Sequence, residues 1–229
     1  MKKTLSISFL YRILIYCLGL LFLAFGVAIS SNSQLGISPT NSLPFAISAA
    51  TGVKVGTIIT LEFGCYILIQ MLLLKQFKPS FFIQLVFSTI FGYFVDFAKL
   101  VLGTFTLSSY LGRLLMLAVS IVLIAVGLVF YLSAELVPMP MEGMCLAINK
   151  RLPRVPFHRI KIGADSLSVA LAALVSLIGT GSISVVREGT VISALLIGKV
   201  MGMLQKPLGP ILRRICFGSQ DNALEKAGC

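Results

Sequence analysis

Apolar residues along this chain form long, nearly uninterrupted runs that are separated by short polar segments. Six runs approach the roughly 20 residues that a helix needs to cross a bilayer: about 10–31, 55–74, 81–102, 111–132, 162–178 and 191–204. The first run follows Met1-Lys2-Lys3 and resembles a signal peptide, but its counterpart at 111–133 cannot be one, so we interpret both as spans. The pattern predicts an all-α protein, a polytopic membrane helical bundle.

Two further apolar segments, 34–48 and 135–149, are too short and too interrupted to span a membrane. They lie 101 residues apart, and this offset aligns Pro39 with Pro140 and Asn41 with Glu142. Prolines interrupt regular helix, and a proline is well suited to be the first residue of a new one. We therefore expect structural breaks at the prolines of both segments: Pro39, Pro44, Pro138 and Pro140.

The same offset relates the spans that precede these segments. Positions between 12 and 48 match without a gap, for example Arg12 with Arg113 and Gly26 with Gly127. This predicts two units, 1–108 and 109–215, followed by a cytoplasmic tail at 216–229. Each unit holds three spans, so the second must enter from the opposite side, which predicts two inverted three-span repeats, each with a broken, re-entrant segment. The alternative is duplication for stability alone, with the broken segments lying as interfacial helices.

Composition and charge fit a chain whose main partner is the lipid bilayer. Mean hydropathy is +0.99 and only 12% of residues are charged, about half the usual share for soluble domains. The net charge of +11 does not indicate nucleic-acid binding, because the basic residues lie between the apolar runs, where they report topology. All lysines and arginines are on inner segments if the N-terminus is inside, except Lys54, Lys99, Arg113, Arg187 and Lys199. Both termini of this multi-pass protein are predicted to be cytoplasmic.

Neither a metal site nor an enzyme active site is expected. The five cysteines are scattered, and the single histidine is His158 in a basic run. No Ser/His, Cys/His or metal-binding constellation is present. We therefore expect no metal, no cofactor and no catalytic residue.

Most of the eight acidic residues lie in or beside the membrane: Glu62, Asp96, Glu135, Glu142, Asp165 and Glu188. An ionised carboxylate in hydrocarbon costs roughly 2.5–3.5 kcal/mol, so such residues usually face a cavity or a partner. Glu62 has no cation within one helical turn, which favours a functional or network role. Glu142 is either a first-turn glutamate that suits the helix dipole, or a proton or cation site.

Two other motifs carry charge. Lys161 precedes Asp165 by four residues, and the pair is compatible with an interfacial salt bridge. Arg187 and Glu188 open the sixth span before Thr190, where they would serve either as a helix start or as an anion site at a helix N-terminus. Physical chemistry alone favours the helix start.

Four motifs together resemble those of the YczE/YyaS/YitT-type bacterial membrane proteins: Leu35-Gly-Ile-Ser-Pro-Thr-Asn-Ser-Leu-Pro44, Pro140-Met-Glu-Gly143, Lys161-Ile-Gly-Ala-Asp165 and Arg187-Glu-Gly-Thr190. The resemblance covers nearly the whole chain. It implies a compact multi-span protein of the bacterial cytoplasmic (inner) membrane without a known cofactor, and it does not specify an activity. It favours a functional over a purely structural role for the charged residues in these motifs. One departure is the alanine before Asp165, where a larger apolar side chain is expected.

These observations predict a small secondary transporter or carrier of a small polar or ionic solute. The expected substrate or ion pathway consists of Asn41, Glu62, Glu142, Lys161, Asp165, Arg187 and Glu188. We expect Glu142 to face a central cavity shared with Asn41 and a charged residue of the fifth span. The alternative is a non-transporting accessory or regulatory membrane protein, or a binding subunit of a larger transport complex. A homo-oligomer is compatible with either function.

Overall fold

A computed structural model describes residues 2–76, 80–182 and 186–217. All regular structure in these residues is helical. The eight helices are α1 (Lys2–Asn32), α2 (Pro39–Thr51), α3 (Val55–Leu74), α4 (Ser80–Leu102), α5 (Tyr110–Ser133), α6 (Pro140–Arg151), α7 (Phe157–Thr180) and α8 (Glu188–Phe217). Six of them are long and apolar enough to cross a membrane, namely all except α2 and α6. The predicted helical membrane bundle is therefore confirmed.

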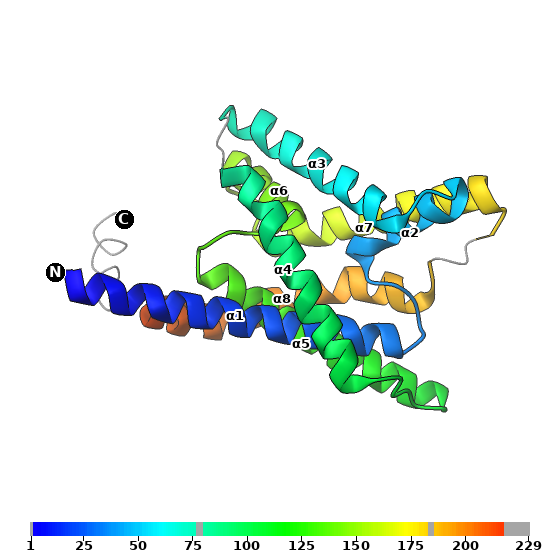
Figure 1. The fold of residues 1–229 in the computed structure, drawn as a ribbon, viewed down its shortest axis with the longest axis horizontal. Helices are drawn as coiled ribbons and strands as arrows, with labels where there is room; N and C mark the ends of the chain where they lie inside the picture. Colours follow the sequence, from blue (N-terminus) through cyan, green and yellow to red (C-terminus); the bar gives the residue numbers. More distant parts are fainter. Residues whose placement is uncertain (1, 77–79, 183–185, 218–229) are drawn as a thin grey trace.

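The helices α1 and α5 form the centre of the bundle. They run antiparallel along its long axis, and α8 packs against α5 (Figure 1). Their backbones approach closely because small residues face each other: a Cβ added to Gly127 would lie 2.7 Å from the carbonyl oxygen of Gly19 and 2.7 Å from the amide nitrogen of Leu23. Gly26 meets α5 in the same way, at Ile124. Close contact between small residues is how membrane helices associate without a hydrophobic driving force.

The two predicted units pair their helices in the same manner. α4 packs on α1, and α8 packs on α5; α2 packs on α7, and α6 packs on α3. The links before the two short helices also match, because Gln34 and Glu135, which the 101-residue offset aligns, both have positive φ values, 57° and 49°. Positive φ is uncommon outside glycine. The fold thus uses the same unusual turn twice.

Three helices extend well beyond the spans expected from the sequence. α1 begins at Lys2 rather than near residue 10, and α7 begins at Phe157 rather than near 162. The sixth span was expected to end near residue 204, but α8 continues through Pro207 and Pro210 to Phe217. The predicted tail therefore begins inside α8, and its remainder, 218–229, lies outside the described residues. Pro44, predicted as a break, lies inside α2 without ending it. Pro39 and Pro140 do open α2 and α6, and Pro138 lies in the link before α6.

The close approach of α1 and α5 gives a stability prediction. Gly127→Ala should destabilise the protein by about 1–3 kcal/mol, because the new methyl group meets backbone atoms that cannot move aside. Gly92→Ala in α4 is the matched control, since a Cβ there meets nothing within 4 Å and alanine favours helix. Thermal melts of the purified variants, followed by circular dichroism, measure both effects. Equal melting temperatures for the two variants would contradict the proposed close packing.

Candidate functional site

The two short helices begin in the interior of the bundle and end at its surface. In α2, Pro39 and Ser42 are buried, whereas the cap after Thr51 is exposed; in α6, Pro140 to Cys145 are buried, whereas Lys150 and Arg151 are exposed. Figure 1 shows the two helices diverging from the middle of the molecule. With 12 and 13 residues they are about 18–20 Å long, more than half of a hydrocarbon core of about 30 Å.

A buried cluster of three charged side chains lies where α6 meets α7. The Lys161 ammonium donates a hydrogen bond to Oδ1 of Asp165 at 2.8 Å and lies 3.4 Å from Oε1 of Glu142. Its third neighbour is the sulfur atom of Met141, at 3.6 Å. Lys161 is 3% exposed, Asp165 is 1% exposed and Glu142 is 6% exposed. Lys161 and Asp165 thus form the predicted pair, but deep in the protein rather than at the membrane interface.

Two helix N-termini add to the electrostatics of this cluster. Glu142 is the third residue of α6, where the helix dipole and free backbone N–H groups favour a negative charge. Thr40, the second residue of α2, lies close enough to Asp165 to interact with its carboxyl group. The cluster therefore joins the starts of both half-length helices to α7. With all three groups ionised, two carboxylates face one ammonium, which leaves one negative charge in excess.

The structure brings three of the predicted pathway residues together: Glu142, Lys161 and Asp165. Asn41 occupies in α2 the same third helical position that Glu142 holds in α6, and it is half-buried. However, the α2 side chain that approaches Asp165 belongs to its neighbour Thr40.

Arg187 and Glu188 do not join the cluster. The Arg187 guanidinium donates a hydrogen bond to the carbonyl oxygen of Gln34 at 2.9 Å, and Glu188 is exposed in the first turn of α8. Thr190 accepts a hydrogen bond from the amide of Ile37 at 3.0 Å. The motif thus opens α8 and attaches its start to the link between α1 and α2, with Thr190 as the third residue of the helix.

Glu62 lies apart from the cluster, in a separate groove lined by residues of α2, α3 and α7 together with Met144 of α6. Its Oε1 atom accepts a hydrogen bond from the hydroxyl of Tyr66 at 2.8 Å. Its Oε2 atom is buried and has no hydrogen-bond partner among the described residues.

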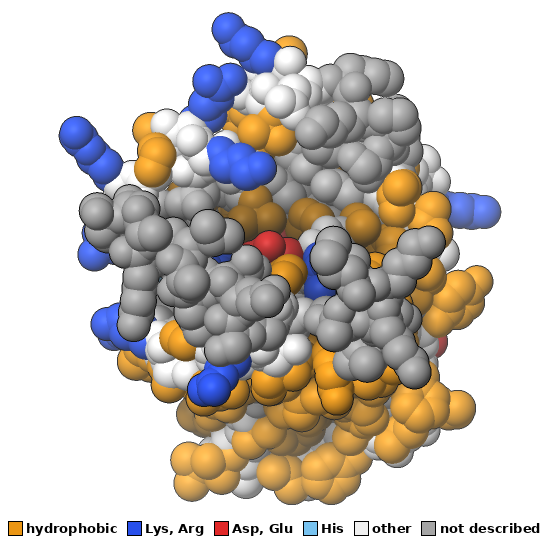
Figure 2. Space-filling model, turned by 90° about the vertical axis from the view of Figure 1, so that its left-hand side faces the viewer, with side chains coloured by type: hydrophobic (Ala, Val, Ile, Leu, Met, Phe, Trp, Pro, Cys, Tyr) orange, Lys and Arg blue, Asp and Glu red, His pale blue; other side chains and the backbone are white. Residues whose placement is uncertain are grey.

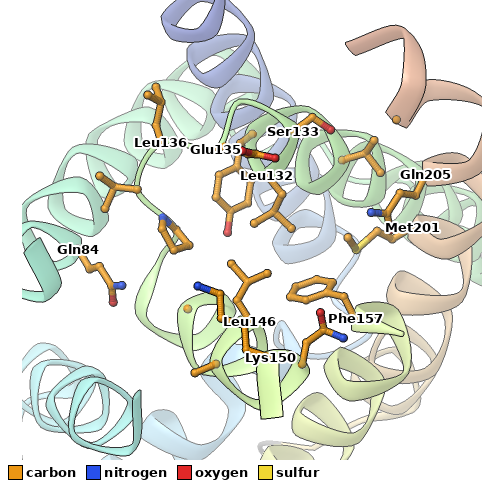
Figure 3. Close-up of a pocket in the computed structure, with 18 of the residues that line it drawn as sticks. Gln84, Leu132, Ser133, Glu135, Leu136, Leu146, Lys150, Phe157, Met201 and Gln205 are labelled. Carbon is orange, nitrogen blue, oxygen red and sulfur yellow. The ribbon is translucent and has the colours of Figure 1, made fainter. Parts of the chain in front are cut away.

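A cavity of about 670 Å³ lies beside the cluster, at the end of the molecule where α1 begins and α8 ends. Its lining comes from α3 to α8, and Figure 3 labels Gln84, Leu132, Lys150, Phe157 and Gln205 among the side chains around it. Seen from that end, Figure 2 shows lysine and arginine side chains around a hollow with acidic atoms inside it. The cavity is large enough for a small solute.

Glu142 and Asp165 do not line this cavity, contrary to our expectation for Glu142. Two residues connect the cavity with the cluster. Gly143 follows Glu142 in α6 and lines the cavity, and Tyr131, also in its wall, is close enough to Glu142 to interact electrostatically. In this conformation the ion cluster is thus adjacent to the cavity and closed off from it.

A pair of buried amides forms part of the cavity wall. Gln70 and Gln84 exchange hydrogen bonds of 3.1 and 3.0 Å, and Gln70 also donates to the carbonyl oxygen of Pro140 at 3.0 Å. A Cβ on Gly143 would lie 2.5 Å from Oε1 of Gln70, so glycine is required for this contact. The pair fixes the start of α6 to α3 and α4.

Sequence reasoning missed the amide pair and one ion pair at the cavity. NH2 of Arg213 lies 3.3 Å from Oε1 of Glu135, and both side chains are more than half exposed. Gln70 and Gln84 could have been recognised from the sequence, because each is a polar residue inside a long apolar run. The residues contributed by α8 carried no comparable signal, because the span was expected to end before them.

The buried charges give a second prediction. Lys161→Met should destabilise the protein by about 3–5 kcal/mol, since it leaves two carboxylates buried without their cation. Adding Asp165→Asn should recover part of the loss. Lys199→Met is the control, because Lys199 is an exposed lysine within a span. Chemical denaturation of the three variants in detergent measures the effect, and a Lys161 variant as stable as the Lys199 control would contradict it.

Comparison with known proteins agrees with the resemblance expected from the motifs. The chain is 29% identical over 201 residues to the uncharacterized protein YyaS of Bacillus subtilis (strain 168), covering 87% of this chain and 92% of the relative. It is also 29% identical over 137 residues to the uncharacterized membrane protein YczE of the same organism, covering 59% and 62%. No solved structure matches. Residues 10–206 match the family of unknown function DUF6198, to which this chain therefore belongs.

Proposed function

We propose that the protein is a small secondary transporter that carries a small polar or ionic solute across the bacterial cytoplasmic membrane. The observation that supports this most is the buried cluster of Glu142, Lys161 and Asp165 at the point where α2 and α6 begin. Ionisable residues inside a membrane are expensive, and in transporters they mark substrate and ion pathways.

The arrangement of α2 and α6 supports a carrier architecture. In many transporters, interrupted helices in matching positions of two inverted repeats direct their N-termini at a site near the middle of the bilayer. Here both short helices start at the cluster, and the units pair their helices alike. We infer that 1–108 and 109–215 are inverted repeats.

The cluster also has a chemical property that suits a carrier. Its excess negative charge can be neutralised by a proton on a carboxylate or by a bound cation. Such neutralisation weakens the attraction between Lys161 and the carboxylate concerned, which would loosen the contact between α6 and α7. A change in occupancy at the cluster would thus be coupled to the packing of the helices that close it.

The cavity supplies a path to the cluster from one side. The end of the protein where α1 begins and α8 ends bears many basic side chains, and basic loops are retained in the cytoplasm (Figure 2). We infer that this end is cytoplasmic and that the described conformation faces inward. The amide pair of Gln70 and Gln84, with Tyr131, then separates the cavity from the cluster.

One observation favours the alternative of a non-transporting accessory protein or a binding subunit. The cluster is enclosed by protein, and the Lys161 ammonium donates hydrogen bonds to Asp165 and Met141 and forms an ion pair with Glu142. Such a network would also serve to hold α6 and α7 together. Transport measurements distinguish the two functions.

The transport test uses the full-length protein in proteoliposomes. Solutes that raise its melting temperature in a screen of small polar compounds are offered in radiolabelled form, with and without a pH gradient. Glu142→Gln should reduce uptake at least tenfold or abolish its dependence on the gradient, because the amide cannot exchange a proton. Asp96→Asn is the control and should retain most of the uptake, because Asp96 is exposed and lines neither the cavity nor the groove around Glu62. Uptake at the wild-type rate by folded Glu142→Gln would contradict a role for the cluster.

The topology test uses single cysteines in a cysteine-free variant. We choose Ser108→Cys and Arg154→Cys because both positions are exposed and Ser108, unlike Ser109, does not cap α5. In intact cells an impermeant maleimide should label the first and spare the second. Labelling of both, or of Arg154→Cys alone, would contradict the proposed orientation.

A further inference from the structure

The groove around Glu62 opens on the lipid-facing side of the bundle. It has a volume of about 570 Å³ and is lined mainly by apolar side chains of α2, α3 and α7. Three of these, Leu61, Leu167 and Leu171, are 65%, 61% and 40% exposed on helices that span the membrane. A ligand in this groove would therefore reach it from the lipid.

Glu62 places a single carboxyl group in the lining of this apolar groove. It is the eighth residue of α3, so it lies about 10 Å along the helix from its start, well inside a hydrocarbon core of about 30 Å. Tyr66 satisfies Oε1 with a hydrogen bond of 2.8 Å. The other oxygen, Oε2, is buried without a hydrogen-bond partner among the described residues.

No cation compensates this carboxylate within the described part of the chain. The ion pairs formed there involve other acidic residues, and the groove lining contains neither lysine nor arginine. A carboxylate with a free oxygen in an apolar environment attracts a positive charge. Small metal ions are poor candidates, since the groove offers few oxygen atoms to replace their water. A ligand that carries its own apolar body has no such requirement.

We propose that the groove binds a hydrophobic organic monocation, with its positive charge at Glu62 and its apolar body between Leu61, Ile69 and Leu171. The volume falls within the range of small-molecule sites. Binding at this site is independent of transport through the ion cluster, so either proposal can fail without the other.

Tetraphenylphosphonium is the test probe, and tetraphenylborate has nearly the same shape with the opposite charge. Binding of each radiolabelled ion to the purified full-length protein is measured in detergent at neutral pH. Wild type should bind the cation with micromolar affinity and the borate at least tenfold more weakly. Glu62→Gln should weaken cation binding at least tenfold, whereas Asp96→Asn, which removes an acidic residue outside the groove, should leave it unchanged. Circular dichroism melts establish that each variant is folded.

A second variant tests the location of the site without removing the carboxylate. Cys65 lines the groove and is exposed, so Cys65→Trp should fill it and abolish cation binding while Glu62 remains. Unchanged binding in folded Cys65→Trp or Glu62→Gln would overturn the proposal. Equal affinity for tetraphenylborate would also overturn it, since the groove would then be an uncharged slot for lipid chains. If Glu62→Gln does not fold, Cys65→Trp and the comparison of the two probes still test whether the groove binds a hydrophobic cation.

Discussion

The charge on Lys161 is the constraint on which the centre of this structure depends. An ammonium group that is 3% exposed between helices is stable only if anions lie beside it, and α7 and α6 each provide one. The same cluster is reached by α2 through Thr40. The short helices α2 and α6 are thereby fixed to α7, which is long enough to cross a membrane. The close backbone contact of α1 and α5 supplies the rigid frame around them.

This arrangement explains how two short helices can begin in the interior of the bundle. Free backbone groups there must be satisfied within the protein or face water. In α6 the carbonyl oxygen of Pro140 accepts from Gln70, and the first turn carries Glu142 close to Lys161. The proline that opens the helix thus costs little, because the N–H group that it lacks has no partner in a helix start. Polar side chains from three other elements complete the site.

Much of the architecture could be predicted because hydrophobic runs and prolines act locally. The six spans, the short helices at Pro39 and Pro140 and the pairing of Lys161 with Asp165 follow from spacing within single segments. The proximity of Glu142 to this pair was expected only in outline, from the equivalence of the two broken segments. The equivalence of the two segments indicated that both would contribute to one site. It did not indicate which of their side chains would come into contact there.

The remaining features depend on contacts between distant segments. Pro44 does not end α2, because the helix is held along its length by packing on α7, and a buried proline is tolerated where neighbouring helices satisfy the backbone. Thr40 rather than Asn41 reaches Asp165, which depends on the rotation of α2 about its axis. The extension of α8 past residue 204 lies beyond the apolar run, and hydropathy detects only the part of a helix that is in lipid.

The length of α8 has a consequence for the connectivity of the chain. Its last described residue, Phe217, packs its ring against the guanidinium of Arg12 in α1, with 4.8 Å between that group and the ring centroid. The first and last helices are thus neighbours at the same end of the bundle (Figure 1). A circular permutant that joined these ends and began at α5 would keep every helix in its place. The contacts between the helices thus do not themselves fix the order in which α1–α4 and α5–α8 follow each other along the chain.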